Sequence, residues 1–294
     1  MSDQSKIPFP ALVAALLVAD SLHFVFGRSL APYLPPTAAS FYYMTLALIQ
    51  ITLFAALRRE IDFSVLRDNF RFFAMIGFLI AVATSASYAA VVYIDPGTAA
   101  LLAQTGILFS LAFGLIWLKE RLVGGEKIGA ILAVIGVLII SFQPGFGSSG
   151  IWLGTLLVLS STFTYALHAA IVKREGGGID FINFFLFRMV SSCFFLFLFT
   201  VGRGELVRPV GREVWLILLL AATVNVTISR ALYYLVLRRI DLTILTILLT
   251  LSPVLTILWS IVLFGERPSL QGLIGGTAVI LGVILVTLSR RNGK

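Results

Sequence analysis

This chain contains a series of ten apolar runs, each about long enough to cross a lipid bilayer as a helix. At about 20 residues per span, the ten runs use roughly two thirds of the 294 residues. The connecting segments are too short to form a separate soluble domain. We therefore predict an all-α polytopic membrane protein in which residues 1–294 form one domain, with spans at about 9–28, 38–57, 70–93, 96–118, 126–143, 150–172, 179–201, 213–237, 241–264 and 269–289.

Composition excludes most other classes of protein. The chain is 59% hydrophobic and only 12% charged, with a mean hydropathy of +1.01, whereas soluble domains carry about 25% charged residues. A soluble enzyme, a disordered chain and a nucleic-acid binder are thereby excluded. The single cysteine, Cys193, and two histidines do not form a disulfide framework or a metal cluster. No known catalytic motif is present, so we expect no enzyme activity, no metal and no cofactor.

The distribution of basic residues predicts the orientation in the membrane. Fifteen of the 22 Lys and Arg residues lie in the N-terminal segment and the loops on its side, five lie on the other side, and Arg188 and Arg230 lie within spans. Cytoplasmic loops carry the excess of Lys and Arg. With an even number of spans, both termini are expected in the cytoplasm. The first run is interpreted as a retained helix rather than a signal peptide, and the location as the inner (plasma) membrane.

The two halves of the chain resemble one another. A shift of 146 residues places Tyr88 on Tyr234, Asp95 on Asp241, and Glu120-Arg121 on Glu266-Arg267. Each half, 1–145 and 146–294, holds five spans, so the second half enters the membrane in the opposite sense. Inverted repeats of this kind are typical of secondary transporters, whose substrate site lies near the bilayer midplane between the halves. We predict transport by alternating access.

Ten spans in two EamA-like halves, each with a Glu-Arg pair at its last loop, resemble the drug/metabolite transporter superfamily. The size of the chain and the sequence of its first three spans are similar to the YddG-type amino-acid exporters of that superfamily. The resemblance implies export of small amphipathic metabolites, most of all amino acids and including aromatic ones. The first span reads Leu22-His23-Phe24-Val25-Phe26-Gly27 where the family often has a Trp-Gly motif, which leaves the substrate class open.

Two polar residues of the first span are candidates for substrate contact. Asp20 and His23 lie three positions apart and so share a helix face. An ionisable group inside a bilayer costs several kcal/mol unless it faces a cavity or a partner. One interpretation is that the pair lines the substrate path and binds an ammonium group or exchanges a proton. The other is that an arginine neutralises Asp20 and that His23 is an interfacial hydrogen-bonding group.

The eighth span carries the most informative polar face. Thr223, Thr227, Arg230 and Tyr234 follow one another at helical spacing. A guanidinium that faces a cavity suits a carboxylate, because its planar fork donates two parallel hydrogen bonds. We expect Arg230 to bind the substrate carboxylate; the alternative is a structural pair with Asp20 or a helix end. Asn225 is interpreted as a contact between helices.

Aromatic and polar side chains of the other spans complete the predicted site. Thr84 and Tyr88 on the third span are the repeat counterparts of Arg230 and Tyr234, and Tyr165 and His168 lie on the sixth. These aromatic groups are expected around a cavity, although Tyr and Trp at span ends, Tyr42 and Tyr43 among them, fit the interfacial aromatic belt. Further candidates are Gln104 for a substrate amine, Pro253 for a gating kink, and Arg188 for a structural pair.

A second substrate class stays open at this stage. A multidrug exporter of organic cations would use an intramembrane carboxylate, which Asp20 supplies, in a cavity without cationic groups. Arg230 argues against this alternative if its side chain reaches the cavity. A membrane enzyme would need acid, base or metal-binding groups clustered near one membrane face, and the two histidines lie on opposite sides. The expected partners are a small-molecule substrate and membrane lipids, with a monomer as the simplest assembly.

Overall fold

The computed structural model describes residues 8–118, 124–141, 150–237, 239, 245 and 248–292. These residues form helices and the turns between them, and no strand occurs in the part of the chain described. The helices are α1 (Phe9–Ser21), α2 (His23–Leu30), α3 (Pro36–Arg58), α4 (Phe63–Asp68), α5 (Phe70–Ala90), α6 (Pro96–Ala103), α7 (Gly106–Leu118), α8 (Gly124–Ser141), α9 (Ile151–Glu175), α10 (Phe181–Gly202), α11 (Arg212–Leu220), the π-helix η1 (Ala221–Ile228), α12 (Ser229–Leu237), α14 (Ser252–Phe264) and α15 (Leu270–Asn292). The prediction of an all-helical membrane protein is confirmed.

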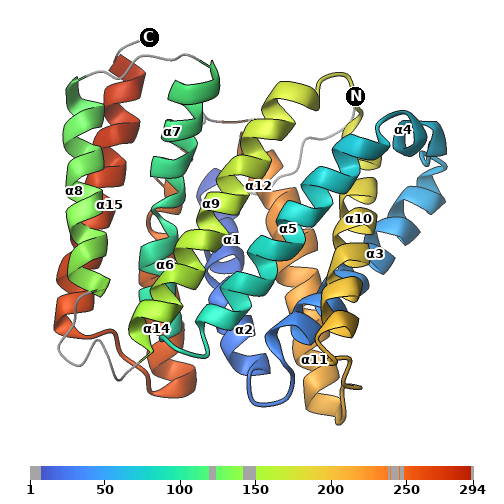
Figure 1. Cartoon of the computed structure of the whole chain (residues 1–294), viewed down its shortest axis with the longest axis horizontal. Coiled ribbons are helices and arrows are strands. Elements are labelled where there is room, and N and C mark those ends of the chain that lie inside the picture. The colour runs from blue at the N-terminus through green and yellow to red at the C-terminus, as the bar shows by residue number, and fades with distance from the viewer. Residues whose placement is uncertain are drawn as a thin grey trace.

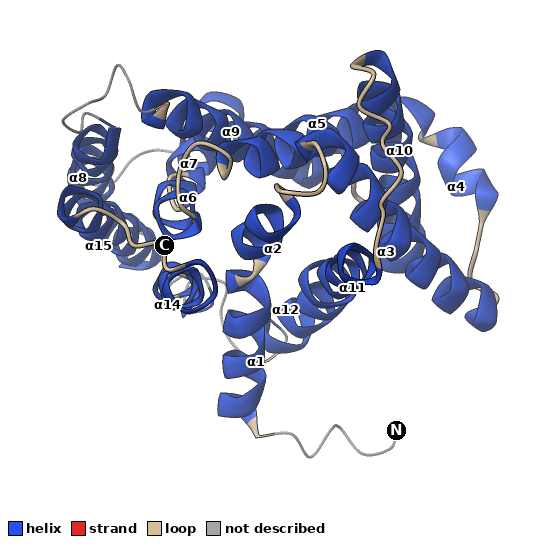
Figure 2. Ribbon diagram, turned by 90° about the horizontal axis from the view of Figure 1, so that it is seen from below, coloured by secondary structure: helices blue, strands red, loops and turns tan. Residues whose placement is uncertain are grey.

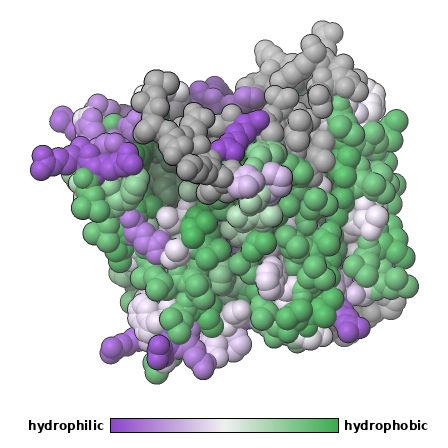
Figure 3. Space-filling view, turned by 180° about the vertical axis from the view of Figure 1, so that it is seen from behind, coloured by the Kyte–Doolittle hydropathy of each residue, from purple (hydrophilic) through white to green (hydrophobic). Residues whose placement is uncertain are grey.

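Eight helical segments in the described ranges are long and apolar enough to cross a membrane. They are α1 with α2, α3, α5, α6 with α7, α9, α10, α11 with η1 and the start of α12, and α15. The predicted runs 126–143 and 241–264 contain α8 and α14, which have 18 and 13 residues. On the face shown in Figure 3, apolar side chains cover most of the middle, and hydrophilic ones gather towards the upper and lower edges.

Proline and aspartate at loop–helix junctions determine where several helices begin. Pro36 and Pro96 occupy first-turn positions, where the missing N–H and the fixed φ of proline cost nothing. The Asp95 side chain accepts the Thr98 N–H at 2.9 Å, and the Asp180 side chain accepts the Asn183 N–H at 3.0 Å. Each carboxylate thus satisfies an N–H group that the helix itself leaves without a partner.

The helices form a bundle in which α1 begins and α15 ends at the same end (Figure 1). Viewed from the other end, α2 lies in the middle and packs against α5, α6, α11 and α14 (Figure 2). The largest buried apolar cluster joins α3, α5, α10 and η1 and contains Phe73, Ile76 and Met189. These contacts hold the helices around the central α1–α2 segment.

Helices α8 and α15 lie side by side at one edge of the bundle (Figure 1) and pack through glycines. A Cβ atom added to Gly129 would lie 2.6 Å from the Gly282 carbonyl oxygen, and one added to Gly136 would lie 2.5 Å from that of Gly275. The two backbones are therefore in direct contact, as small residues allow in membrane helices. The sequence predicts close helix contact for Gly125, Gly129, Gly272 and Gly276, and a Cβ on Gly276 would lie 2.4 Å from the Leu101 side chain of α6.

Four membrane segments lose regular α-helical geometry near their middle. Leu22 separates α1 from α2, Gln104 and Thr105 separate α6 from α7, and α14 begins only at Ser252. The fourth is η1, which inserts eight π-helical residues between α11 and α12. Broken membrane helices and π-helical turns occur often at binding sites. Irregular backbone at membrane depth is tolerated where it is buried in protein or lines a cavity.

Candidate substrate-binding cavity

A cavity of about 590 Å³ lies where these irregular segments meet. Its lining comes from both halves of the chain: α1, α2, α3, α5, α6 and α7 from the first, and α9, α10, η1, α12 and α14 from the second. Seven predicted site residues line it, namely Asp20, His23, Gln104, Tyr165, His168, Arg230 and Pro253. A cavity of this size can enclose a small metabolite.

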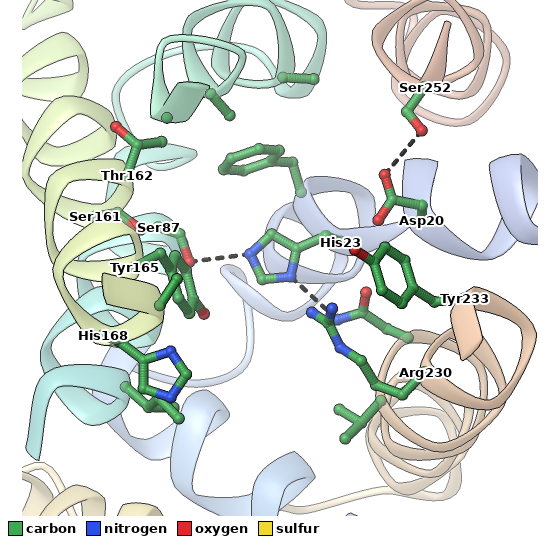
Figure 4. Close-up of a pocket in the computed structure, with 18 of the residues that line it drawn as sticks. Asp20, His23, Ser87, Ser161, Thr162, Tyr165, His168, Arg230, Tyr233 and Ser252 are labelled. Atoms are coloured by element: carbon green, nitrogen blue, oxygen red, sulfur yellow. Dashed lines mark hydrogen bonds between the residues drawn. The ribbon is translucent and has the colours of Figure 1, made fainter. Parts of the chain in front are cut away.

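One wall of the cavity carries opposite charges. The Asp20 carboxylate, at the end of α1, accepts a hydrogen bond of 2.8 Å from the Ser252 hydroxyl at the start of α14. Arg230 of α12 lies on the same side of the cavity (Figure 4), and its positive charge interacts with Asp20 and His23. The Arg230 side chain is exposed rather than packed away. This wall therefore carries one acidic and one basic side chain.

His23 occupies the centre of the cavity and uses both ring nitrogens (Figure 4). Its Nδ1 lies 3.0 Å from Asn225 Nδ2, and its Nε2 lies 3.0 Å from the Ser87 hydroxyl. An amide nitrogen only donates, so with Asn225 in this orientation Nδ1 accepts, and Nε2 carries the proton and donates to Ser87. Ser87 donates onward to the Thr84 carbonyl at 2.9 Å. These two contacts fix the orientation of the His23 ring.

The opposite wall is formed by α9 and α10. Tyr165 and His168 of α9 lie across the cavity from Asp20 and Arg230 (Figure 4), and the Tyr165 hydroxyl is 2.9 Å from the hydroxyl of Thr84. The His168 Nε2 is buried without a hydrogen-bond partner among the described residues. Arg188 of α10 also lines the cavity, with its guanidinium 4.6 Å from the ring centroid of Phe185.

Two tyrosines stack at the cavity wall. The rings of Tyr43 and Tyr88 have centroids 5.0 Å apart and an interplanar angle of 18°. Tyr43 lines the cavity and is 1% exposed, so the interpretation of Tyr43 as part of an interfacial belt is wrong. The reason is that Pro35 and Pro36 start α3 early enough to place Tyr43 two turns inside the helix. Tyr88 lies behind Tyr43 and contacts the His23 ring edge-on at 5.5 Å.

The other predicted site residues take several positions. Thr84 is fully buried behind the wall, where it hydrogen-bonds to Tyr165. Gln104 lies at the break between α6 and α7, and Pro253 occupies the first turn of α14. The Tyr234 side chain lies outside the described residues, although its backbone belongs to α12.

The sequence alone does not assign several of the cavity-lining residues to the site. Ser87, Ser252 and Asn225 hold Asp20 and His23 by hydrogen bonds. Serine and asparagine are common in membrane helices as contacts between helices, so only the three-dimensional structure distinguishes these from the rest. The described residues contain no group of three or more His, Cys, Asp or Glu side chains that could hold a metal ion.

The end of the bundle opposite the α1 start is held by an ion pair between the two halves. The Arg28 guanidinium of α2 pairs with Glu266, between α14 and α15, through Nε at 2.9 Å and also through Nη2. Its Nη1 donates to the Val91 carbonyl after α5 at 3.0 Å. The neighbouring Gly27 packs so closely that a Cβ there would lie 3.1 Å from the Val91 side chain. Arg28 thereby joins α2, the end of α5 and the α14–α15 loop.

A model of the EamA-like transporter family matches the chain twice, over residues 9–142 and 152–288. The chain belongs to the EamA-like transporter family. The resemblance to the drug/metabolite transporter superfamily is thereby confirmed, and with it a multi-pass membrane transporter. Both halves of the bundle described above fall within a family match, so the cavity is built from two family units.

Two relatives of the chain are described as uncharacterized transporters. The uncharacterized transporter YdfC of Bacillus subtilis is 25% identical over 198 residues, which are 66% of this chain and 63% of that protein, less than two thirds of its length. An uncharacterized transporter of Clostridium kluyveri is 25% identical over 228 residues, 74% of this chain and 72% of that protein. A solved crystal structure with 21% identity superposes with a TM-score of 0.65 over 96% of this chain and 98% of that one, which shows the fold alone.

Proposed function

We propose that this EamA-family transporter exports amino acids across the inner membrane by alternating access. The observation that carries the proposal is that Arg230 and Asp20 line one wall of a single cavity. A free amino acid carries a carboxylate and an ammonium group on one carbon. Arg230 can receive the carboxylate through two parallel hydrogen bonds, while Asp20, steadied by Ser252, receives the ammonium. Tyr43, Tyr165 and Phe24, which line the cavity, surround the side chain.

An exporter of organic cations is the second candidate, and the lining of the cavity argues against it. Such a substrate would be attracted by Asp20 but repelled by Arg230 and Arg188, which both line the cavity. Like charges brought together at low dielectric cost several kcal/mol. In this cavity, each charged group of a zwitterion finds a residue of the opposite charge.

The proposed topology is ten membrane helices in two inverted repeats, with both termini in the cytoplasm. The double family match supports two equivalent halves, and the glycine contacts of α8 and α15 support their inversion. A shift of 146 residues turns Gly129 into Gly275 and Gly136 into Gly282, so it exchanges the contact Gly129–Gly282 with the contact Gly136–Gly275. A two-fold axis between the helices would do the same.

Uptake by proteoliposomes tests the proposed function. The purified protein is reconstituted, and saturable uptake of labelled neutral and acidic amino acids is compared with uptake of an organic cation such as tetraphenylphosphonium. We expect saturable amino-acid flux and no cation flux. Repeating the assay with an imposed pH gradient tests whether Asp20 or His23 also exchanges a proton. Saturable flux of the cation alone would overturn the proposal.

Alternating access predicts that the Arg28–Glu266 pair closes the outer face and must break for that face to open. In a Cys193→Ala background, which lacks the only native cysteine, a reporter Ala100→Cys in the cavity lining is labelled from outside with an impermeant maleimide. A partly exposed ion pair contributes about 1 kcal/mol, so Arg28→Gln or Glu266→Gln should raise the labelling rate about fivefold.

The control for this prediction removes an ion pair at the same end of the bundle whose two partners lie in one loop. The Glu205 carboxylate also accepts a hydrogen bond from Thr37 of α3, and Arg203→Gln leaves that bond in place. Arg203 pairs with Glu205 within a single loop, and Arg203→Gln should leave the labelling rate unchanged. Reversing the charges together, with Arg28→Glu and Glu266→Arg, should restore the original rate. Equal labelling in all variants would show that the pair does not control the outer face.

A further inference from the structure

Gln50 of α3 does not line the cavity, yet both ends of its side-chain amide are hydrogen-bonded. Its Nε2 donates to the Thr223 hydroxyl, and its Oε1 accepts from the Thr227 hydroxyl, each at 2.8 Å. Both threonines belong to the π-helix η1. A side-chain amide in a membrane segment needs such partners, because hydrocarbon offers none. The amide thus connects α3 to η1 at two points.

The π-helix divides a polar face that regular α-helical geometry would keep together. At α-helical spacing, Thr223, Thr227 and Arg230 would share one side of the helix. In the structure the two threonines bind to α3, whereas Arg230, the second residue after η1, lines the cavity (Figure 4). A π-helical turn is bonded from residue i to i+5 instead of i+4. Converting one such turn to α-helix would rotate the residues after it by about 100°, the angle per residue of an α-helix.

Two side chains of the site depend on the course of η1. Asn225 lies within η1, and its Nδ2 is 3.0 Å from His23 Nδ1. Arg230 lies on the same side of the cavity as Asp20 (Figure 4). A rotation of about 100° would turn Arg230 away from the cavity and would change the direction of Asn225. The geometry of the site therefore requires the π-helical turn, a form that is rare and occurs often at functional sites.

We infer that Gln50 is a positioning residue for substrate binding, because it keeps η1 in its π-helical form through the two threonines. It thereby aims Arg230 and Asn225 into the cavity without touching the substrate itself. The inference rests on the proposed function. Glutamine suits this role because its amide carries both a donor and an acceptor, so one side chain serves one hydroxyl that accepts and one that donates.

Replacing Gln50 by methionine tests the inference, because Gln50→Met keeps the length of the side chain and removes both hydrogen bonds. In counterflow of labelled L-leucine, we expect KM to rise about tenfold and kcat to change less than about threefold, since one hydrogen bond to a charged group is lost. A purely structural role would lower the number of active transporters, and hence kcat, and leave KM unchanged. The matched control is Gln271→Met, which removes a hydrogen bond from α15 to the Ile139 carbonyl of α8 and should not change KM.

A triple variant covers the case in which Gln50→Met alone folds poorly. Combining Gln50→Met with Thr223→Val and Thr227→Val leaves no polar group of this contact without a partner. Removing all partners together costs less stability than removing one. The triple variant should therefore keep the melting temperature of the unmodified protein and still show the raised KM, whereas Thr227→Ser, which keeps the hydroxyl, should retain the original KM.

The labelling of a cysteine at position 230 reports its direction without any substrate. In the Cys193→Ala background, Arg230→Cys is labelled in detergent with a charged methanethiosulfonate. Adding Gln50→Met should lower the labelling rate about fivefold, because the thiol leaves the water-filled cavity and is less ionised. The reporter Ala100→Cys, which lines the cavity from α6, should be labelled at the same rate with and without Gln50→Met.

The outcomes separate this inference from the proposed function. An unchanged KM in both the single and the triple variant, or an unchanged labelling rate at position 230, would show that Gln50 does not aim Arg230. A lower kcat with an unchanged KM would make Gln50 a structural contact only. If the unmodified protein carries no amino acid, the proposed function fails, and the labelling rate alone then decides whether Gln50 positions Arg230.

Discussion

Replacing Arg230 by alanine is expected to lower amino-acid uptake about a hundredfold. Loss of charge-assisted hydrogen bonds to a carboxylate costs about 3 kcal/mol in a site shielded from water, and each 1.4 kcal/mol is a factor of ten. The effect should be larger than for other lining residues, because the carboxylate would be left inside the cavity without a cation on that wall. Initial uptake rates at subsaturating substrate measure it directly.

Arg230→Lys separates charge from geometry in this prediction. Lysine keeps the positive charge but lacks the planar fork, so we expect uptake between that of the original protein and that of Arg230→Ala. Arg212→Ala, at the first residue of α11 and outside the cavity, is the matched control and should transport normally. Unchanged uptake by Arg230→Ala would show that Arg230 does not bind the substrate carboxylate.

Leucine in place of Gly136 is expected to destabilise the folded protein by about 3 kcal/mol, the upper end of the usual range for overpacking. A Cβ at this position lies 2.5 Å from the Gly275 carbonyl oxygen and 2.7 Å from the Val279 amide nitrogen. Both obstacles are backbone atoms, so the helices α8 and α15 must move apart. The expected result is a lower melting temperature and a smaller monodisperse fraction in detergent.

Gly124 provides the comparison within the same helix. A Cβ added there meets no atom within 4 Å, so Gly124→Leu should leave the melting temperature close to that of the original protein. Both variants add the same apolar side chain to α8, so the two proteins are equally hydrophobic. They differ only in whether the new side chain meets other atoms. Equal melting temperatures for the two variants would show that α8 and α15 do not require glycine at their contact.

The fold could be predicted from the sequence to a useful level because bilayer thickness fixes helix length. Eight of the apolar runs coincide with helical segments long enough to cross a membrane, and loop prolines such as Pro36 and Pro96 mark where helices begin. The sequence predicts the interruptions within these helices less well than the helices themselves. Pro253 indicates one break, but Leu22 carries no signal, and no residue type in Ala221–Ile228 marks the π-helical turn. These interruptions build the cavity, so its shape required the structure.

The candidate site was predicted best where a residue type is costly in a membrane. An ionisable side chain inside a bilayer is costly unless it faces a cavity or a partner. The sequence therefore singles out Asp20 and Arg230, and both line the cavity. The sequence does not show whether Tyr43 lines the cavity or lies at the membrane interface, because aromatic side chains also occur often at the interface. The sequence predicts a structural pair for Arg188, and its position beside the cavity depends on how α10 packs against α5 and α3.

Competition by three matched compounds tests whether one molecule binds to Arg230 and Asp20 together. Leucine, the amine that lacks its carboxylate (3-methylbutylamine) and the acid that lacks its amine (4-methylpentanoate) are compared as inhibitors of labelled amino-acid counterflow. If Arg230 and Asp20 bind the two charged groups of one molecule, leucine competes at least tenfold better than either fragment. If the amine competes as well as leucine, the cavity recognises cations alone and the amino-acid account is contradicted.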